Sequence, residues 1–581
     1  MSGGAFFAGL DWSRVISHAG YYGVGFSLFT APFFVLTDNP FIIYRGISVT
    51  CAVLQAATAP VCFHLMETYF DVKDVKLKYL LSFSASFMVA TRATVIYNEH
   101  IMIFLTWVLV WILLKLHSCV EDRLQVRIQT ILLAAVLAYS LTVHTRALIY
   151  WLAVLSVVAG YLILYKKWLV SRFSAVPAAL IGILLSKNFV SYMQNALWAS
   201  GGEPLRNSQI SVSFQQNWSN PVTWKAWTSI VLGQLNTITM FSGGWMMLVF
   251  IVLVSLIAWK LYVRFRLYNI EADSIEEKRD GGILICGVFA IVACALTIAG
   301  QSLMWLNGVA EAFRGGFNSE AYALKAITYI RYFAPYIGPL FMAGVLYLYG
   351  NQRWRDRVLA AYVISAGILQ IFWLTMILPY MYQNYDASEA YRVWGLWNYH
   401  TAGSVVSLRT YLAGSLMLFI SSVILMVCWR YGKTRQALGA LALIMLFTYC
   451  YSAWHLDIVH AEAIGYSKGN KGYELMQELE ARYDPDDTVY VVDGVPGRLD
   501  NYNFYMYQFL LSRYTVIPDM PKEDTELLVF CNKSRYEPLF ELGYESYTLD
   551  RNEYVYVKDG KYRDWLEELG VVSKENRNEP E

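Results

Sequence analysis

The sequence is poor in charge and lacks the cysteine patterns of metal-binding or disulfide-stabilised proteins. Only 16% of its 581 residues are charged, against about 25% in a typical soluble domain. Its eight cysteines form no CxxC pair, so the sequence predicts neither a zinc site nor a disulfide framework. A single large soluble enzyme is therefore excluded.

The sequence contains many long apolar runs. Hydrophobic residues make up 56% of the chain, and the mean hydropathy is +0.37. Runs of about 20 residues can cross a hydrocarbon core as helices, and their continuity favours helices over barrel strands. We therefore expect a polytopic α-helical membrane protein with about twelve transmembrane helices. The expected helices are 42–66, 79–97, 99–118, 128–144, 147–165, 173–190, 243–263, 281–305, 333–350, 358–381, 409–429 and 436–454.

Lys and Arg collect in one alternating set of loops, which predicts the orientation. Short loops between helices hold about twenty of these residues, and such loops favour the cytoplasm. The segments 191–242, 306–332 and 382–408 are then expected outside, together with the N-terminus and everything after residue 454. The sequence shows no signal peptide or upstream helix to carry this N-terminus across, which suggests that the chain begins one helix late.

The chain changes character after the last apolar run. From Trp454 onward it holds 26 acidic and 14 basic residues, and short alternating helix and strand patterns indicate a small α/β domain. Its expected helices are YELMQELEARY, NFYMYQFLLSR, YEPLFELG and KYRDWLEELG, and its expected strands are TVYVVD, YTVIPD, ELLVFCN and EYVYV. No glycine-rich phosphate loop, metal cluster or nucleophile motif occurs there. We divide the chain into an outer juxtamembrane segment (1–41), a transmembrane domain (42–454) and a C-terminal extracytoplasmic α/β domain (455–581). The acidic tail argues against nucleic acid as a partner.

Ionisable residues at the ends of membrane helices are the candidate site residues, because charge near a bilayer is costly. By the predicted topology, four groups of them meet on the outer side. They are Asp11, Arg14 and His18; Arg92, Glu99 and His100; His144 and Arg146; and Lys325, Arg331 and Tyr332.

Each group also has a simpler interpretation. A helix-end arginine such as Arg92 or Arg331 can anchor at the lipid headgroups, and Glu99 with His100 can cap a water-facing turn. The aromatic stretch YYGVGFSLFTAPFF can lie on the membrane surface, where Tyr and Phe are favoured. The sequence alone leaves these alternatives open.

The same segments resemble a known family. The stretch GAFFAGLDWSRVISHAGYYGVGFSLFTAPFF resembles the end of the first outer loop of bacterial GT-C glycosyltransferases, which lies along the membrane surface. IYNEH looks like their second acidic loop, VHTRAL like their His-x-Arg turn, and YIRYFAPYIGPL like their Arg-Tyr…Pro motif. The similarity covers most of the membrane part, while the C-terminal domain matches only as an expected appendage.

The resemblance implies sugar transfer from a polyprenyl-phosphate donor to an acceptor hydroxyl of a glycan, lipid or protein on the outer face, with inversion. The family's catalytic carboxylate would lie upstream of Met1, so Asp11 is only a weak substitute for it. Residues expected to bind the donor phosphate are Arg331, Tyr332, Arg146, His144 and Arg92.

The resemblance also bears on cofactors. Glu99 and His100 are candidate ligands of a divalent cation such as Mg²⁺ or Mn²⁺, since carboxylate and imidazole suit such metals. No organic cofactor is expected.

Two rival functions remain open from the sequence. A transporter or flippase for lipid-linked sugars would carry polar residues through its helix centres and broken helices at the midplane, whereas here they gather near one face. A non-catalytic family member would explain the missing acidic motif.

Overall fold

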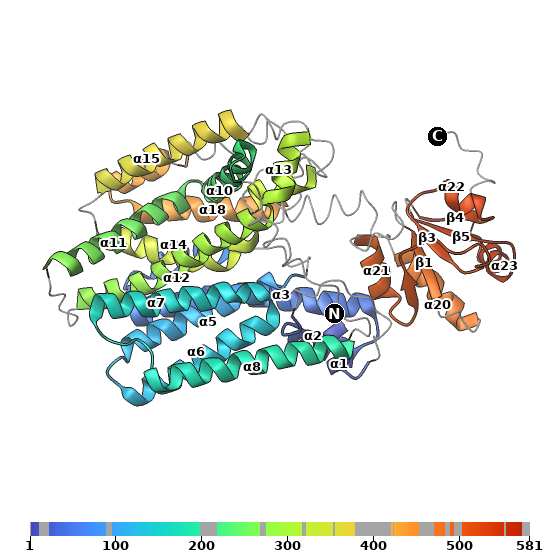
Figure 1. Cartoon of the computed structure of the whole chain (residues 1–581), viewed down its shortest axis with the longest axis horizontal. Helices are drawn as coiled ribbons and strands as arrows, with labels where there is room; N and C mark the ends of the chain where they lie inside the picture. Colours follow the sequence, from blue (N-terminus) through green and yellow to red (C-terminus); the bar gives the residue numbers. More distant parts are fainter. Residues whose placement is uncertain are drawn as a thin grey trace.

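The computed structural model describes most of both predicted regions (Figure 1). The described residues are 2–10, 23–88, 96–197, 218–267, 275–315, 321–329, 331–351, 355–377, 420–421, 423–452, 470–482, 488–492, 502–550 and 553–571.

The membrane part is a bundle of α-helices with short 3₁₀ and π segments. Its elements are α1 (Ser2–Phe7), α2 (Ser27–Leu36), α3 (Pro40–Tyr69), α4 (Val75–Phe87), α5 (Glu99–Ser118), α6 (Arg123–Val143), η1 (Thr145–Ala147), α7 (Leu148–Tyr165), α8 (Arg172–Leu197), α10 (Pro221–Phe241), α11 (Trp245–Leu267), α12 (Ile275–Met304), α13 (Leu306–Gly315), η2 (Ala321–Thr328), η3 (Arg331–Phe333), α14 (Ala334–Gly350), α15 (Arg355–Phe372), η4 (Trp373–Ile377) and α18 (Thr434–Ser452).

Nine helical stretches in the described part of the chain are long and apolar enough to span a membrane. The protein is thus a polytopic helical membrane protein with a small C-terminal α/β domain. The count of twelve stays a prediction, because the expected helices at 358–381 and 409–429 lie partly outside the described residues.

Polar caps explain where several helices begin. Asn39 accepts hydrogen bonds from the backbone N–H groups of Phe41 and Ile42, and Pro40 occupies the first turn of α3, the position where proline is best tolerated. Asp122 caps α6 in the same way, so that helix starts at Arg123 rather than at the predicted residue 128.

The prediction for the second helix is wrong at its end. We expected it to continue to residue 97, but α4 ends at Phe87 and residues 96–98 are not helical. Asn98 instead donates its side-chain amide to the carbonyl of Val143, 3.1 Å away. This bond joins the turn before α5 to the end of α6.

The two ends of the bundle differ in charge. At the end with the Lys/Arg-rich loops, Arg435 pairs with Asp74, and Lys260 pairs with Glu277 at 2.7 Å. The opposite end carries Glu99 and the turn between α6 and α7. We call it the site end.

A helical cap at the site end was not predicted. The segments 191–242 and 306–332 were expected as outer connections, but they contain α10, α13 and η2, which pack together around a separate apolar core. Buried side chains in it include Ile230, Leu306 and Leu324. The side-chain amide of Gln234 on α10 donates to the side-chain oxygen of Gln301 (3.0 Å) and to the carbonyl of Ala326 (2.9 Å).

The C-terminal domain contains a five-stranded mixed sheet in the order β2-β1-β3-β5-β4. The strands β1, β2 and β3 are parallel, and β5 joins β3 and β4 in antiparallel pairs. The predicted helices and strands are present, whereas β4 was not predicted. The elements are α20 (Asn470–Arg482), β1 (Thr488–Val492), α21 (Tyr502–Leu510), β2 (Thr515–Ile517), β3 (Val529–Cys531), α22 (Glu537–Glu541), β4 (Glu545–Asp550), β5 (Glu553–Val557) and α23 (Lys561–Glu568).

The α/β domain contacts the site end of the bundle at the start of α3. Phe41 packs edge-on against Tyr473 of α20 with ring centroids 5.3 Å apart. Tyr44 also packs edge-on against Phe509, with ring centroids 6.3 Å apart. The domain and the predicted site residues therefore share one side of the protein, as Figure 1 shows for the strands and α20.

Close packing of α14 generates a stability prediction. A Cβ atom added to Gly338 would lie 2.6 Å from the backbone carbonyl oxygen of Ala85, which cannot rotate away. Gly338→Ala should therefore destabilise the protein by about 1–3 kcal/mol, the usual cost of overpacking. Thermal unfolding in detergent would measure it. Gly367→Ala on α15, where no atom lies within 4 Å of the added carbon, is the control; equal unfolding midpoints for the two variants would contradict this packing.

Candidate functional site

Three turns that are far apart in sequence meet at the site end. Glu99 begins α5, His144 and Arg146 lie in the turn between α6 and α7, and Arg331 precedes α14. Glu99 is 2% exposed and Arg331 6% exposed, so these charges are removed from bulk water. A buried charge is tolerated only when it is paired.

The pairing is centred on one carboxylate oxygen. Nη2 of Arg146 donates to Oε1 of Glu99 at 2.5 Å, and Nε of Arg331 lies 3.5 Å from the same oxygen. Two guanidinium groups and one carboxylate give this trio a net charge of +1. Glu99 thus holds together two arginines that would otherwise repel each other.

Tyrosine rings enclose the two guanidinium groups. The carbon of the Arg146 guanidinium lies 3.5 Å from the ring centre of Tyr332. Arg331 lies 4.3 Å from the ring centre of Tyr97 and 5.4 Å from that of Tyr329. Cation–π contact with a desolvated ring stabilises such groups. The sequence analysis missed Tyr97 and Tyr329, although both stand within the motifs it quoted.

His144 supports Arg146. The backbone N–H of Arg146 lies 3.1 Å from Nδ1 of His144, and its side-chain Nε lies 3.2 Å from Nε2. A neutral imidazole accepts a hydrogen bond at only one nitrogen, so its tautomer selects one of these bonds. Burial, with the cation of Arg146 beside it, holds the pKa of His144 well below its ordinary value. The ring is therefore a neutral acceptor that orients Arg146.

The remaining candidates lie elsewhere or outside the described residues. Asp11 and Arg92 fall in the ranges 11–22 and 89–95, which the structure does not describe, as do Arg14 and His18. Lys325 is buried in the helical cap, with its ammonium 5.2 Å from the ring centre of Trp305.

The metal prediction concerns Glu99 and His100. Among the described residues, no group of three or more His, Cys, Asp or Glu side chains could hold a metal ion. His100 is buried beside Glu99, but the nearby guanidinium groups of Arg146 and Arg331 would repel a divalent cation. A metal requirement stays a prediction.

Part of the aromatic stretch is attached to the same turn. The backbone N–H groups of Gly23 and Gly25 donate to the carbonyls of Val143 (3.0 Å) and Thr142 (2.8 Å), and Tyr139 donates its hydroxyl to the carbonyl of Gly25. A Cβ atom on Gly23 would lie 1.8 Å from the Thr142 oxygen. Only glycine permits this approach, which holds the segment entering α2 against the site.

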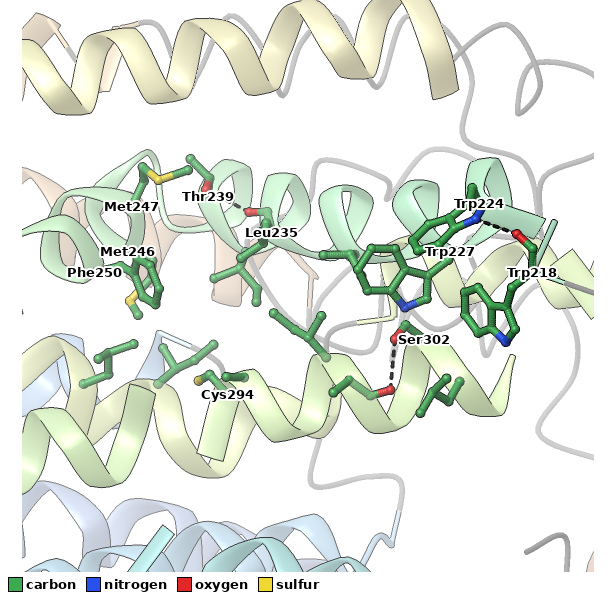
Figure 2. A pocket seen from close by; sticks show the side chains of 18 residues that line it. Trp218, Trp224, Trp227, Leu235, Thr239, Met246, Met247, Phe250, Cys294 and Ser302 are labelled. Atoms are coloured by element: carbon green, nitrogen blue, oxygen red, sulfur yellow. Dashed lines mark hydrogen bonds between the residues drawn. The ribbon is translucent and has the colours of Figure 1, made fainter. Parts of the chain in front are cut away.

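A large apolar cavity lies between α10, α11, α12 and α14. Its volume is about 790 Å³, within the range of ligand pockets. Figure 2 shows Trp218, Trp224 and Trp227 at one end, and Met246, Met247 and Phe250 at the other.

The cavity offers almost no polar group to a ligand. The hydroxyls of Thr239 and Ser302 donate to carbonyls of their own helices (Figure 2). Ile337 and Leu340 line it from α14, the helix that Arg331 precedes. The sequence analysis did not predict this cavity.

Comparison with known proteins finds similar solved structures but no similar sequence. No protein-family model matches the sequence, and no curated protein matches it. Two crystal structures of ArnT from Cupriavidus metallidurans align with it. The one bound to undecaprenyl phosphate covers 95% of this chain and 91% of its own, with 14% identity and a TM-score of 0.48. The apo structure covers 96% and 91%, with 13% identity and a TM-score of 0.47. Values this low assign no activity to this chain.

The shared carboxylate generates a second prediction. Glu99→Gln should lower the free energy of unfolding by about 3–5 kcal/mol, because it leaves the buried guanidinium of Arg331 and the partly buried one of Arg146 without their counter-charge. The measurement is again thermal unfolding of the full chain in detergent.

The matched control is Glu121→Gln. Glu121 pairs with Lys167 at 2.6 Å, but its side chain is 77% exposed, and exposed pairs contribute about 0–1 kcal/mol. An unfolding midpoint for Glu99→Gln as high as that of the control would refute the role assigned to Glu99.

Proposed function

We propose that this protein is a membrane glycosyltransferase that moves a sugar from a polyprenyl-phosphate donor to an acceptor hydroxyl. The observation that carries the proposal is the trio of Glu99, Arg146 and Arg331, with its net charge of +1 and its two guanidinium groups around one buried carboxylate. A polyprenyl-phosphate sugar is a phosphodiester with one negative charge, which matches this trio. The motif resemblance to GT-C glycosyltransferases points to the same reaction.

The arrangement suits the transition state of sugar transfer. As the bond between the anomeric carbon and the phosphate oxygen breaks, the sugar acquires oxocarbenium character and the phosphate gains negative charge. Each guanidinium group carries five N–H donors in a planar fork, the geometry that matches phosphate oxygens. Donors fixed in advance, in a site with little water, stabilise developing charge with little reorganisation.

The apolar cavity supplies a place for the donor's lipid chain. Its lining is hydrocarbon and aromatic, so a prenyl chain would bury apolar surface there without leaving a polar group unpaired. α14 connects the two parts of this site, with Arg331 just before it and Ile337 within it.

The proton acceptor is not assigned among the described residues. Glu99 is engaged by arginine, and His144 orients Arg146, so neither is suited to take the proton of the acceptor. The resemblance expects a carboxylate in the first outer loop, upstream of Met1, and Asp11 is only a weak substitute for it. Transfer on the non-cytoplasmic face, inversion at the anomeric carbon and use of Mg²⁺ or Mn²⁺ belong to the same proposal.

The direct test is sugar transfer by Arg331 variants. Arg331→Ala should lower kcat at least 100-fold, the cost of removing one preorganised donor to a developing oxyanion. Arg331→Lys, which keeps the charge but loses the planar fork, should retain a small part of the activity. The assay follows release of polyprenyl phosphate from a polyprenyl-phosphate sugar in proteoliposomes. Arg430→Ala, at an exposed helix position, is the control, and a full rate in Arg331→Ala would disprove the proposal.

The cavity generates a second functional prediction. Ala299→Phe places a ring in the space between α10 and α12 and should raise the KM for a long polyprenyl donor several-fold, because the chain competes with the ring for volume. A donor with a short prenyl chain should be affected less. Ala360→Phe on an exposed position of α15 is the matched control. Unchanged KM values for both donors would exclude this cavity as the lipid site.

A further inference from the structure

A second, polar pocket lies between the membrane part and the α/β domain. Its volume is about 320 Å³. One wall is formed by Asp38 and Asn39 at the start of α3, with Phe34 of α2 beneath them. The other wall is formed by α20 and by the end of α21 with the residues after it. The pocket therefore exists only where the two domains meet.

Its polar groups are planar side chains held in place by neighbours. The hydroxyl of Tyr473 accepts a hydrogen bond from the Gln477 amide at 2.9 Å. Oε1 of Glu480 accepts the hydroxyl proton of Tyr514 at 2.8 Å, and its Oε2 lies 3.6 Å from Nη1 of Arg513. Glu480 is thus fixed in orientation by two partners from the adjoining segment.

Asn39 adds a donor to the opposite wall. Its side-chain oxygen accepts from the backbone of Phe41 and Ile42 as the cap of α3. The amide nitrogen of the same group keeps both of its protons for other partners. The pocket consequently offers acceptors on Asp38 and Glu480 and a donor on Asn39, around a floor of apolar side chains.

The charge of the lining selects among ligands. Asp38 and Glu480 are acidic and Arg513 is the single basic residue among the lining residues, so the pocket carries a net charge of −1. An anionic lipid headgroup or a phosphate would be repelled. A ligand with many hydroxyl groups, neutral or bearing an amine, would find donors and acceptors together with an aromatic ring.

We propose that this pocket binds a saccharide that is neutral or carries an amino group. Vicinal hydroxyls pair with the planar groups of Glu480, Gln477 and Asn39, and a C–H face of the sugar ring lies on Tyr473. The proposal of saccharide binding is argued only from the residues that line the pocket. Its assignment as the place where the acceptor glycan is held rests on the proposed function.

The experiment is saturation-transfer NMR on the full chain in nanodiscs of neutral lipid. The probes are methyl glycosides of neutral hexoses, N-acetylhexosamines and hexosamines, with their β-linked disaccharides, and glycerol phosphate as the anionic comparator. At least one saccharide should receive signal at its ring C–H protons, and glycerol phosphate should not. A signal from glycerol phosphate alone, or from no probe, overturns the proposal.

Two variants on one helix locate the binding. Glu480→Gln keeps the size of the side chain and should raise the Kd of the best saccharide at least tenfold, while Glu478→Gln, exposed on α20 and absent from the lining, should leave it unchanged. Equal loss in both variants overturns the assignment. Unchanged unfolding midpoints exclude a general effect on folding.

Two further binding measurements distinguish saccharide binding from the proposed sugar transfer. Arg331→Ala and saturating polyprenyl phosphate should leave saccharide binding unchanged, because the donor site is a different one. Displacement by polyprenyl phosphate would overturn the claim of a separate site. Absence of sugar transfer by the wild-type protein would remove the proposed function and leave the measured binding standing.

Discussion

The site depends on one constraint: a single buried carboxylate, Glu99, has to pair with two guanidinium groups, the buried one of Arg331 and the partly buried one of Arg146. Glu99 occurs at the start of α5, and Arg146 and Arg331 come from turns 47 and 232 residues later in the chain. Leaving any one of these charges buried alone would be strongly unfavourable, so the trio couples the positions of three helix ends. The ring of Tyr332 lies against the guanidinium group of Arg146, and the ring of Tyr97 lies against that of Arg331.

The bundle has an apolar core and a charged end. Apolar packing of α3, α5, α12 and α14 forms most of the core. The charged side chains of the candidate site lie at one end, where the bundle meets the helical cap and the α/β domain. The large cavity adjoins α14 on its apolar side, and the polar pocket adjoins α3. The lipid-linked donor of the proposed function would require both environments, an apolar one for its chain and a cationic one for its phosphate.

Much of this could be predicted from the sequence because the strongest signals are local. Apolar length located α5 at residues 99–118, as found, and the Lys/Arg bias placed Glu99, Arg146 and Arg331 at the same end. The helical cap was missed because Gln234 and Asn236 make the sequence of α10 resemble an outer connection. The hydrogen-bond partners of Gln234 lie 67 and 92 residues further along the chain. The strand β4 was missed because Glu545, Ser546 and Asp550 interrupt the alternation of apolar and polar residues that indicates a strand. The pairing of Glu99 with Arg146 was not predicted, because local patterns do not show which of the charges gathered at one end contact each other.

The most direct test of the central claim is an experimental structure of the full chain in nanodiscs with bound undecaprenyl phosphate. The account predicts the phosphate within hydrogen-bonding distance, about 3 Å, of the guanidinium groups of both Arg146 and Arg331, with Glu99 still between them and the prenyl chain directed along α14 into the apolar cavity. A phosphate bound elsewhere, with the Glu99 trio closed and untouched by the lipid, would contradict it.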